Sequence, residues 1–298
     1  MKKDDQDVKS VTSFIERDVP YASNSEAQKL DIFLPAGGRK PYPVIIWIHP
    51  GGFFEGDKSG GGAQDPLAMV DMVKLVLPIL ARGYAMVSIN YRLSHEAQFP
   101  SVVVDAKAAV RWVRGNAGKY NFNSEKVASW GSSAGGYLSA FLAVSEGVEE
   151  VEDLSMGNPD QSSRVIAAVN WYGCTDFLAM DPQSIQLGQG LWEGGHDAET
   201  SPESKLIGGP IRSFPERCKA SNPINYVKPN HAPIYIQHGR NDNIVPYLQS
   251  VLLVEKLRAV GGPEVIFEVI ENVGHADPVF FTSENVNKML DFLDKYIK

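Results

Sequence analysis

The sequence predicts an α/β fold with a central, mostly parallel sheet of about eight strands flanked by helices. Short apolar runs rich in β-branched residues alternate along the chain with amphipathic stretches at helical spacing. This alternation is typical of parallel strands that are connected by helices covering both faces of the sheet. No internal repeat, low-complexity block or Pro/Gly-rich linker divides the chain, so we expect residues 1–298 to form a single domain.

Residues 30–34 alternate in a strand-like way, and the other predicted strands are short apolar runs, such as VIIWI at 44–48, which has the composition of a strand buried on both faces. The predicted strands are 30–34, 44–48, 84–89, 127–130, 165–172, 233–237 and 265–270. The predicted helices are 67–81, 102–117, 133–144, 248–260 and 284–297. Residues 1–17 precede all of these elements, and we expect them to form an N-terminal tail.

One long stretch, residues 176–229, departs from this rhythm. It is polar, contains four glycines between positions 188 and 195, and shows weak periodicity. A long irregular stretch inside a compact domain is usually an insertion with a function. We therefore expect residues 177–229 to form a cap-like segment near the mouth of an active site, the alternative being a surface excursion with no function.

Charge and composition argue against several classes of function. Asp and Glu total 36 against 28 Lys and Arg, a net charge of −8, which makes nucleic acid or an anionic membrane a poor partner. No apolar run approaches the roughly 18 residues of a membrane helix. The N-terminal MKKDDQDVKS lacks the apolar core of a signal peptide, so the sequence as written predicts a cytoplasmic protein. A secreted or periplasmic protein is expected if a leader has been removed.

The cysteine and histidine content argues against metal chemistry. Two cysteines, Cys174 and Cys218, exclude a disulfide scaffold and a Cys-rich metal site, and we expect both to be buried free thiols rather than one bridge. The six histidines show neither an HExxH motif nor paired spacing with carboxylates. We therefore expect no metal and no cofactor.

The sharpest motif is GSSAG at 131–135, a G-x-S-x-G that directly follows a predicted strand and opens a predicted helix. Such a turn holds the serine in a strained corner that exposes its hydroxyl, and a side chain at Gly131 or Gly135 would clash with neighbouring backbone. Ser132 does not fit the motif, because it would need a glycine where Trp130 stands. We therefore expect Ser133 to be a nucleophile.

A second motif, HPGGF, directly follows the predicted strand VIIWI. The backbone N–H groups of its glycine pair, Gly51 and Gly52, can point at a developing oxyanion, and each such donor is worth about 3–4 kcal/mol in comparable sites. The helix that begins at the nucleophile adds the N–H of Ala134, supported by the helix dipole. We expect these three groups to form an oxyanion hole and His49 to brace the loop, a plain glycine-rich turn being the alternative.

A serine hydroxyl needs a base that is itself oriented by an acid, in the chain order serine, acid, histidine for this arrangement. Asp242 and His275 each directly follow a predicted strand, where open α/β sheets place their active sites. They are the predicted acid and base. Asp176 and Asp277 remain alternative acids, and His238 is expected to be a hydrogen-bonded core histidine beneath the acid loop.

These motifs together resemble those of α/β-hydrolase esterases, most closely the bifunctional feruloyl and acetyl-xylan esterase group beside the hormone-sensitive-lipase-like carboxylesterases. The resemblance extends over residues 18–297 and includes GSSAGG, HPGGFFEGDK, NYRL and HGRNDNIVPYLQS. In such enzymes the serine of G-x-S-x-G, the aspartate of HGxxDxxVP and the late GH histidine form the triad. These positions correspond here to Ser133, Asp242 and His275.

The chain departs from the family pattern at two positions. Pro50 stands where the family loop usually has a small residue, and it lacks an N–H, but the resemblance places the donors at Gly51 and Gly52. Cys174 stands where a proline is common, which affects the local backbone more than the chemistry. The HGxxDxxVPxxQS form favours the feruloyl/acetyl-xylan group.

The resemblance implies a small-molecule or oligosaccharide ester as substrate, with acetyl or feruloyl groups on plant-wall carbohydrate, and a monomer or small homo-oligomer. Phe53, Phe54 and Trp192 are expected near the active face, where they could bind substrate or simply cover the core edge. A generic short-chain carboxylesterase, a serine peptidase and a non-catalytic hydrolase-fold binding protein remain alternatives. The polar insertion argues against a lipase, which needs an apolar lid.

Overall fold

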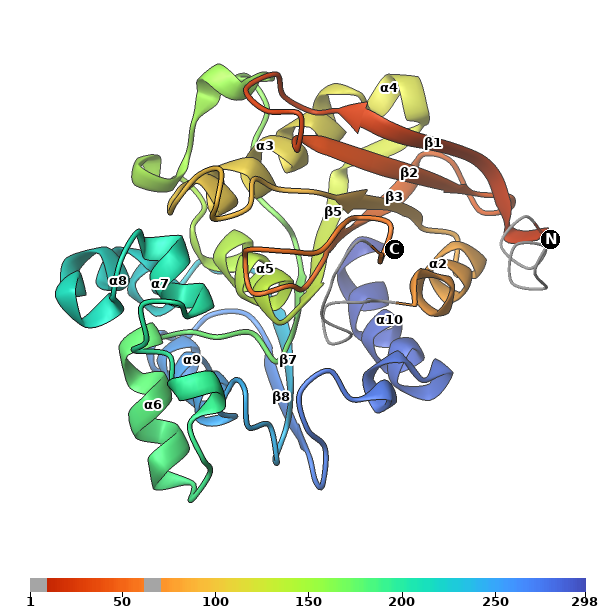
Figure 1. Ribbon diagram of the computed structural model, residues 1–298. Helices are drawn as coiled ribbons and strands as arrows, with labels where there is room; N and C mark the ends of the chain where they lie inside the picture. The colour runs from red at the N-terminus through yellow and green to blue at the C-terminus, as the bar shows by residue number, and fades with distance from the viewer. Residues whose placement is uncertain (1–9, 62–70) are drawn as a thin grey trace.

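The computed structural model describes residues 10–61 and 71–298 and places eight strands of this part of the chain in one sheet (Figure 1). The strand order is β1-β2-β4-β3-β5-β6-β7-β8. The first two strands pair antiparallel with each other, β2 pairs antiparallel with β4, and all later neighbours are parallel. The strands are β1 (Thr12–Pro20), β2 (Lys29–Pro35), β3 (Tyr42–Ile48), β4 (Ala85–Ile89), β5 (Phe122–Ser132), β6 (Ala168–Trp171), β7 (Ile234–Gly239) and β8 (Val265–Ile270). The predicted mostly parallel, eight-stranded sheet is confirmed.

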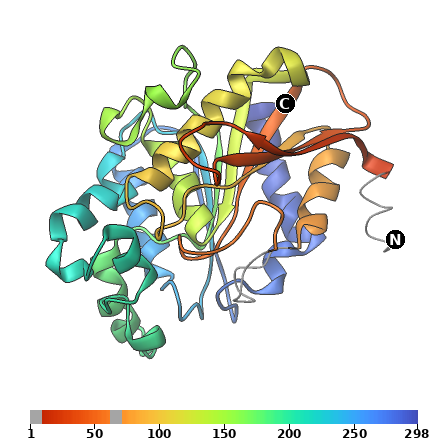
Figure 2. The ribbon, with the colours of Figure 1, turned by 45° about the horizontal axis from the view of Figure 1, so that its top comes forward.

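Helices cover both faces of this sheet, and one hydrophobic cluster lies beneath each layer (Figure 2). The helices are α2 (Met72–Ala81), α3 (Ser101–Gly115), α4 (Ala117–Tyr120), α5 (Ala134–Val144), α6 (Phe177–Gln186), α7 (Pro202–Ile207), α8 (Pro215–Ser221), α9 (Leu248–Val260) and α10 (Ser283–Ile297). Along β3, Val44, Ile46 and Ile48 face the side of α3, α5 and α9. Ile45 and Trp47 face α2 and α10, so successive residues of β3 pack against the helices on opposite faces of the sheet. No helix in the described part of the chain is long and apolar enough to cross a bilayer.

Three tryptophans from neighbouring strands pack edge-on against one another on the face that α10 covers. The ring centroids of Trp47, Trp130 and Trp171 lie 4.9–6.2 Å apart, and all three side chains are fully buried. Aromatic pairs of this geometry add about 0.5–1.5 kcal/mol beyond the area that they bury. The cluster therefore fixes β3, β5 and β6 together close to their carboxyl ends.

The expected N-terminal tail over residues 1–17 is wrong from Thr12 onward, because β1 begins there and pairs with β2 at the edge of the sheet. Most side chains of β1 are exposed, Phe14 and Ile15 among them, so the strand lacks the apolar run that marks a buried strand. Residues 1–9 lie outside the described part of the chain. So do residues 67–70 of the predicted helix 67–81, whose described portion, α2, begins at Met72.

The insertion 177–229 is more regular than its sequence predicts, because it contains α6, α7 and α8 as well as several 3-10 turns. Its helices have only 6–10 residues, too few for a clear helical period. Local caps define the starts of two of them: the Asp176 side chain accepts from Leu178 N at α6, and Ser201 accepts from Ser204 N at α7. The three helices gather beside α9 (Figure 1).

Candidate active site

Ser133 lies in the sharp turn between β5 and α5, with a left-handed backbone at φ 53°. Its N–H donates to the Trp171 carbonyl at 2.9 Å, which ties the turn to the next strand. A Cβ at Gly131 would lie 2.2 Å from the Gly135 carbonyl oxygen, and a Cβ at Gly135 would lie 2.0 Å from that of Ile48. The predicted need for glycine at both positions is therefore confirmed, and the strained backbone presents the serine side chain at the sheet edge.

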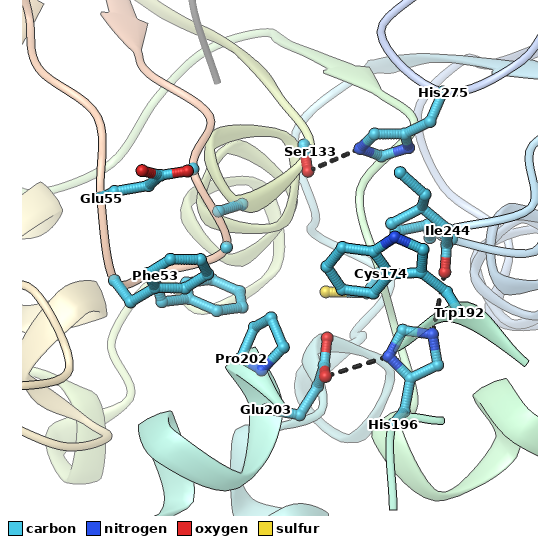
Figure 3. Close-up of a pocket in the computed structure, with 15 residues that line it drawn as sticks. Phe53, Glu55, Ser133, Cys174, Trp192, His196, Pro202, Glu203, Ile244 and His275 are labelled. Carbon is cyan, nitrogen blue, oxygen red and sulfur yellow. Dashed lines mark hydrogen bonds and ion pairs between the residues drawn. The ribbon is translucent and has the colours of Figure 1, made fainter. Parts of the chain in front are cut away.

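The side chains of Ser133, His275 and Asp242 form one hydrogen-bonded chain. Ser133 Oγ lies 3.0 Å from His275 Nε2 (Figure 3), and Asp242 Oδ2 lies 2.7 Å from His275 Nδ1. The three residues follow β5, β7 and β8, whose carboxyl ends meet at the same edge of the sheet. With Nδ1–H donating to the carboxylate, Nε2 is left to accept the serine proton, which is what a serine nucleophile requires.

Asp242 is fully buried, and three hydrogen bonds and a neighbouring histidine compensate its charge. Its Oδ1 accepts from the backbone N–H groups of Ile244 (3.0 Å) and Val245 (2.8 Å). Its Oδ2 accepts from His275 Nδ1 and lies 3.2 Å from His238 Nε2, which donates to the Val245 carbonyl oxygen at 2.8 Å. Burial alone would raise the pKa of Asp242, but the two histidines outweigh it and hold the pKa well below its ordinary value. The carboxylate therefore stays ionised beside His275.

The carboxylates of the two alternative acids, Asp176 and Asp277, accept hydrogen bonds from the backbone at the starts of helical turns. The Asp176 carboxylate accepts from Leu178 N at 3.1 Å, and the Asp277 carboxylate accepts from Val279 N at 2.9 Å. His238 is the hydrogen-bonded core histidine that the sequence predicts: Nδ1 contacts Ser250 Oγ at 2.7 Å while Nε2 faces the acid loop.

Gly51, Gly52 and Ala134 line the cavity next to the serine. Gly51 and Gly52 have φ values of +122° and +54°, and a Cβ at Gly51 would lie 2.1 Å from the Glu55 carbonyl oxygen. Ala134 is the first residue of α5, and within the described chain neither its N–H nor that of Gly52 has an acceptor. These donors are free to bind an anionic oxygen.

His49 braces this loop, as the sequence predicts. Its ring stacks on Tyr91 with centroids 4.4 Å apart, and Nδ1 donates to the Pro50 carbonyl oxygen at 2.6 Å. Burial lowers the pKa of His49 to about 4, so the ring is neutral near pH 7. A Cβ at Gly56 would lie 2.5 Å from the His49 Nδ1, which fixes the course of the loop around the ring.

The cavity in front of Ser133 opens between the carboxyl ends of the strands and the insertion (Figure 3). The three aromatic residues predicted for substrate binding all line it. Phe53 is also a core residue, packed against Tyr137 at 5.1 Å. Phe54 is half-buried with the Lys205 ammonium 4.5 Å above its ring, and Trp192 comes from the insertion.

Sequence reasoning missed the polar part of this cavity wall. His196 and Glu203, both from the insertion, form an ion pair with Nδ1 and Oε2 3.0 Å apart. No motif or spacing marks the pair, because their contact depends on how the short helices fold. Cys174 also lines the cavity, and it and Cys218 are buried free thiols, as predicted. The described residues contain no group of three or more His, Cys, Asp or Glu side chains that could hold a metal ion.

A comparison with models of protein families finds that the model of the BD-FAE family matches residues 30–257 of this chain. The chain belongs to the BD-FAE family. This is a family of bifunctional acetyl/feruloyl esterases with the α/β-hydrolase fold, so the resemblance seen in the sequence is confirmed. The likeness extends to Esterase LipQ of Mycobacterium tuberculosis, 29% identical over 262 residues and 87% of this chain. The chain spans about half the length of the curated relatives that it matches.

Two solved structures are similar over nearly the whole chain. One is a truncated form of a carbohydrate esterase from gut microbiota, with 33% identity, a TM-score of 0.81 and 96% of each chain covered. The other is a bifunctional GH43-CE protein of Bacteroides eggerthii, with 31% identity and a TM-score of 0.80. The match covers 94% of this chain and 35% of that protein. Carbohydrate esterases are therefore among the structural neighbours of this family member.

Proposed function

We propose that the chain is a serine esterase that removes acetyl or feruloyl groups from plant-wall carbohydrate such as xylan. The observation that carries the chemistry is the unbroken chain Ser133–His275–Asp242 at the wall of a cavity, with free backbone donors beside it. The family and the carbohydrate-esterase neighbours support the substrate class.

In the first half of the reaction Ser133 Oγ attacks the ester carbonyl carbon while His275 Nε2 takes the hydroxyl proton. The carbonyl oxygen becomes an oxyanion, which the N–H groups of Gly51, Gly52 and Ala134 bind. Because these donors are fixed by the loop and by α5, they stabilise the transition state without reorganising. Collapse of the tetrahedral intermediate breaks the ester C–O bond, and His275 passes its proton to the departing alcohol.

In the second half a water molecule takes the place of the alcohol. His275 accepts a proton from this water as its oxygen attacks the acyl carbon, the same donors hold the second oxyanion, and collapse returns the proton to Ser133 Oγ. Asp242 holds His275 in the tautomer with Nδ1–H and stabilises the imidazolium that forms in each half. Besides the ester and this water, these steps use only groups of the chain itself.

The substrate class is tested by turnover of the wild type and Ser133→Ala on p-nitrophenyl acetate, methyl ferulate and acetylated xylan. We expect the wild type to cleave methyl ferulate or acetylated xylan as well as the activated ester, and the alanine variant to cleave none of them. Turnover of p-nitrophenyl acetate alone would reduce the proposal to a short-chain carboxylesterase, which is the second candidate. Activity that survives in Ser133→Ala would contradict the serine mechanism.

A further inference from the structure

Two acidic residues line the cavity, Glu55 from the glycine loop and Glu203 from α7, among walls that are mostly apolar. The apolar lining comes from Phe53, Phe54, Trp192, Pro202, Ile244 and Val245. Glu203 is only 4% exposed, and the surface that it retains faces the cavity. A carboxylate in such a place is costly unless its oxygens are paired, so its partners decide what it can do.

One carboxylate oxygen of Glu203 is paired with His196. Oε2 lies 3.0 Å from His196 Nδ1, while Nε2 of the same ring lies 2.9 Å from the Ile244 carbonyl oxygen. Since a carbonyl oxygen can only accept, Nε2 carries a hydrogen, and one further proton lies between Nδ1 and Oε2. Burial would lower the pKa of His196, but Glu203 outweighs it and raises the pKa, which favours the charged form of the ring.

The backbone of His196 is held independently of this pair. Asp181 Oδ1 accepts from His196 N at 2.8 Å, and Asp181 Oδ2 accepts from Asp197 N at 3.0 Å. The His196 ring is thus fixed through its backbone and its Nε2, and its Nδ1 orients the Glu203 carboxylate.

The second carboxylate oxygen, Oε1, points away from His196 into the cavity (Figure 3). No hydrogen-bond donor of the described residues reaches it. In the free protein water can satisfy this oxygen, but a bound substrate displaces that water. A substrate hydroxyl replaces the lost hydrogen bond, whereas a hydrocarbon group leaves a charged acceptor unpaired.

We propose that Glu203 determines specificity by accepting, through Oε1, a hydrogen bond from a hydroxyl group of the ester substrate. This inference rests on the proposed function, because it assumes that esters are cleaved in this cavity. The hydroxyl can come from either half of the substrate: from a sugar beside the ester oxygen, or from the phenol of a feruloyl-type acyl group. Both sources present the same O–H donor, and matched pairs of substrates separate them.

The experiment compares kcat/KM for two such pairs. Glycerol monoacetate and propyl acetate differ in hydroxyls on the alcohol half, and methyl p-coumarate and methyl cinnamate differ in the phenolic hydroxyl on the acyl half. Each pair is measured with the wild type, Glu203→Leu and Glu203→Gln. Glu199→Gln is the control, because it removes the same charge from an exposed position of the insertion.

We expect Glu203→Leu to lower the preference for the hydroxylated member of one pair by about 10- to 100-fold, and the affected pair identifies the source. Glu203→Gln keeps an acceptor for His196 Nδ1 but turns an NH₂ group to the cavity. A neutral hydrogen bond then replaces a charge-assisted one, and we expect a loss of about 3- to 10-fold. The glutamine variant keeps the volume of the side chain and so tests the inference even if the leucine variant does not fold.

Unchanged preferences in both pairs, in Glu203 variants that fold and turn over, would overturn the inference and leave the proposed function intact. So would an equal loss on both members of each pair, since a residue that only supports the wall would produce it. A wild type that hydrolyses none of the four esters would overturn the proposed function and this inference with it.

Discussion

The edge of the sheet and the insertion meet at the same cavity, but they position their side chains by different means. Ser133, Asp242 and His275 stand in turns directly after strands, so the ladders of the sheet and backbone N–H groups fix them. The insertion places His196 and Glu203 through local side-chain hydrogen bonds on short helices. The proposed reactive groups thus depend on the sheet, whereas one wall of the cavity lies on a segment that can vary separately.

The largest effect is expected from the sheet side, at Asp242→Asn. The amide cannot stabilise the imidazolium and favours the wrong His275 tautomer, so kcat should fall by about 10⁴-fold. Asp176→Asn and Asp277→Asn are matched controls because these carboxylates cap helices, and their kcat should stay within a few fold. Steady-state kinetics on p-nitrophenyl acetate measures all three. A control that loses as much activity as Asp242→Asn would reassign the acid.

Gly52→Ala tests the oxyanion loop. The φ of +54° disfavours a side chain, and a Cβ would lie 2.9 Å from the Phe54 ring, so the N–H should shift and kcat fall by about 10²-fold. Gly188→Ala in the insertion is the control: its φ is +69°, but open space surrounds it. Both variants should lose about 1 kcal/mol of stability in urea unfolding, and only Gly52→Ala should lose kcat. Equal kcat values for the two variants would contradict the proposed role of the Gly52 N–H in binding the oxyanion.

The sequence predicts the sheet side of this comparison well for a physical reason. A strand that is buried on both faces appears in the sequence as an apolar run. The reactive side chains follow such runs in motifs whose backbone geometry requires particular residues, as at Gly131 and Gly135. The edge strand β1 has no apolar run that would predict it, because most of its side chains face solvent. The His196–Glu203 pair is equally hidden, since Nε2 of this histidine finds its acceptor 48 residues away at Ile244.

The two regions should also respond to acid in opposite directions. His49 is buried and neutral with a pKa of about 4, below its ordinary 6.5, so only the unfolded chain takes up this proton between these values. Its contribution to the free energy of unfolding is therefore present above pH 6.5 and falls by about 2–3 kcal/mol as the pH drops toward 4. The pKa of His196 is raised, so its contribution is complete below pH 6.5 and is lost as the pH rises through the folded-state value.

Urea unfolding at pH 4.5, 5.5 and 7.5 separates the two histidines. His49→Asn keeps a donor near Pro50 and should lose less stability than the wild type on acidification. His196→Gln keeps a donor for Ile244, and its deficit relative to the wild type should narrow as the pH rises. Parallel pH curves for the wild type and His49→Asn would show that His49 is not buried as a neutral ring.

The smallest effect is expected at the mouth, from Trp192→Ala. The ring lines the cavity from the insertion and is not part of the Ser133–His275–Asp242 chain, so its loss should raise KM for methyl ferulate by about 3- to 10-fold. The kcat on p-nitrophenyl acetate should stay within about twofold. Leu191→Ala, the exposed neighbour, should change neither value. A large drop in kcat for Trp192→Ala would contradict the separation between the two regions.

The buried tryptophan cluster divides the intrinsic fluorescence of the molecule into a component from the core and a component from the cavity. Of its five tryptophans, Trp47, Trp130 and Trp171 pack edge-on in the buried core and Trp112 is 8% exposed. Only Trp192 is partly open to solvent, at the cavity. Collisional quenchers such as acrylamide should therefore extinguish one component of the emission while the folded core keeps the rest. The quenchable component reports occupancy of the cavity, and the near-ultraviolet dichroism of the coupled rings reports the integrity of the sheet.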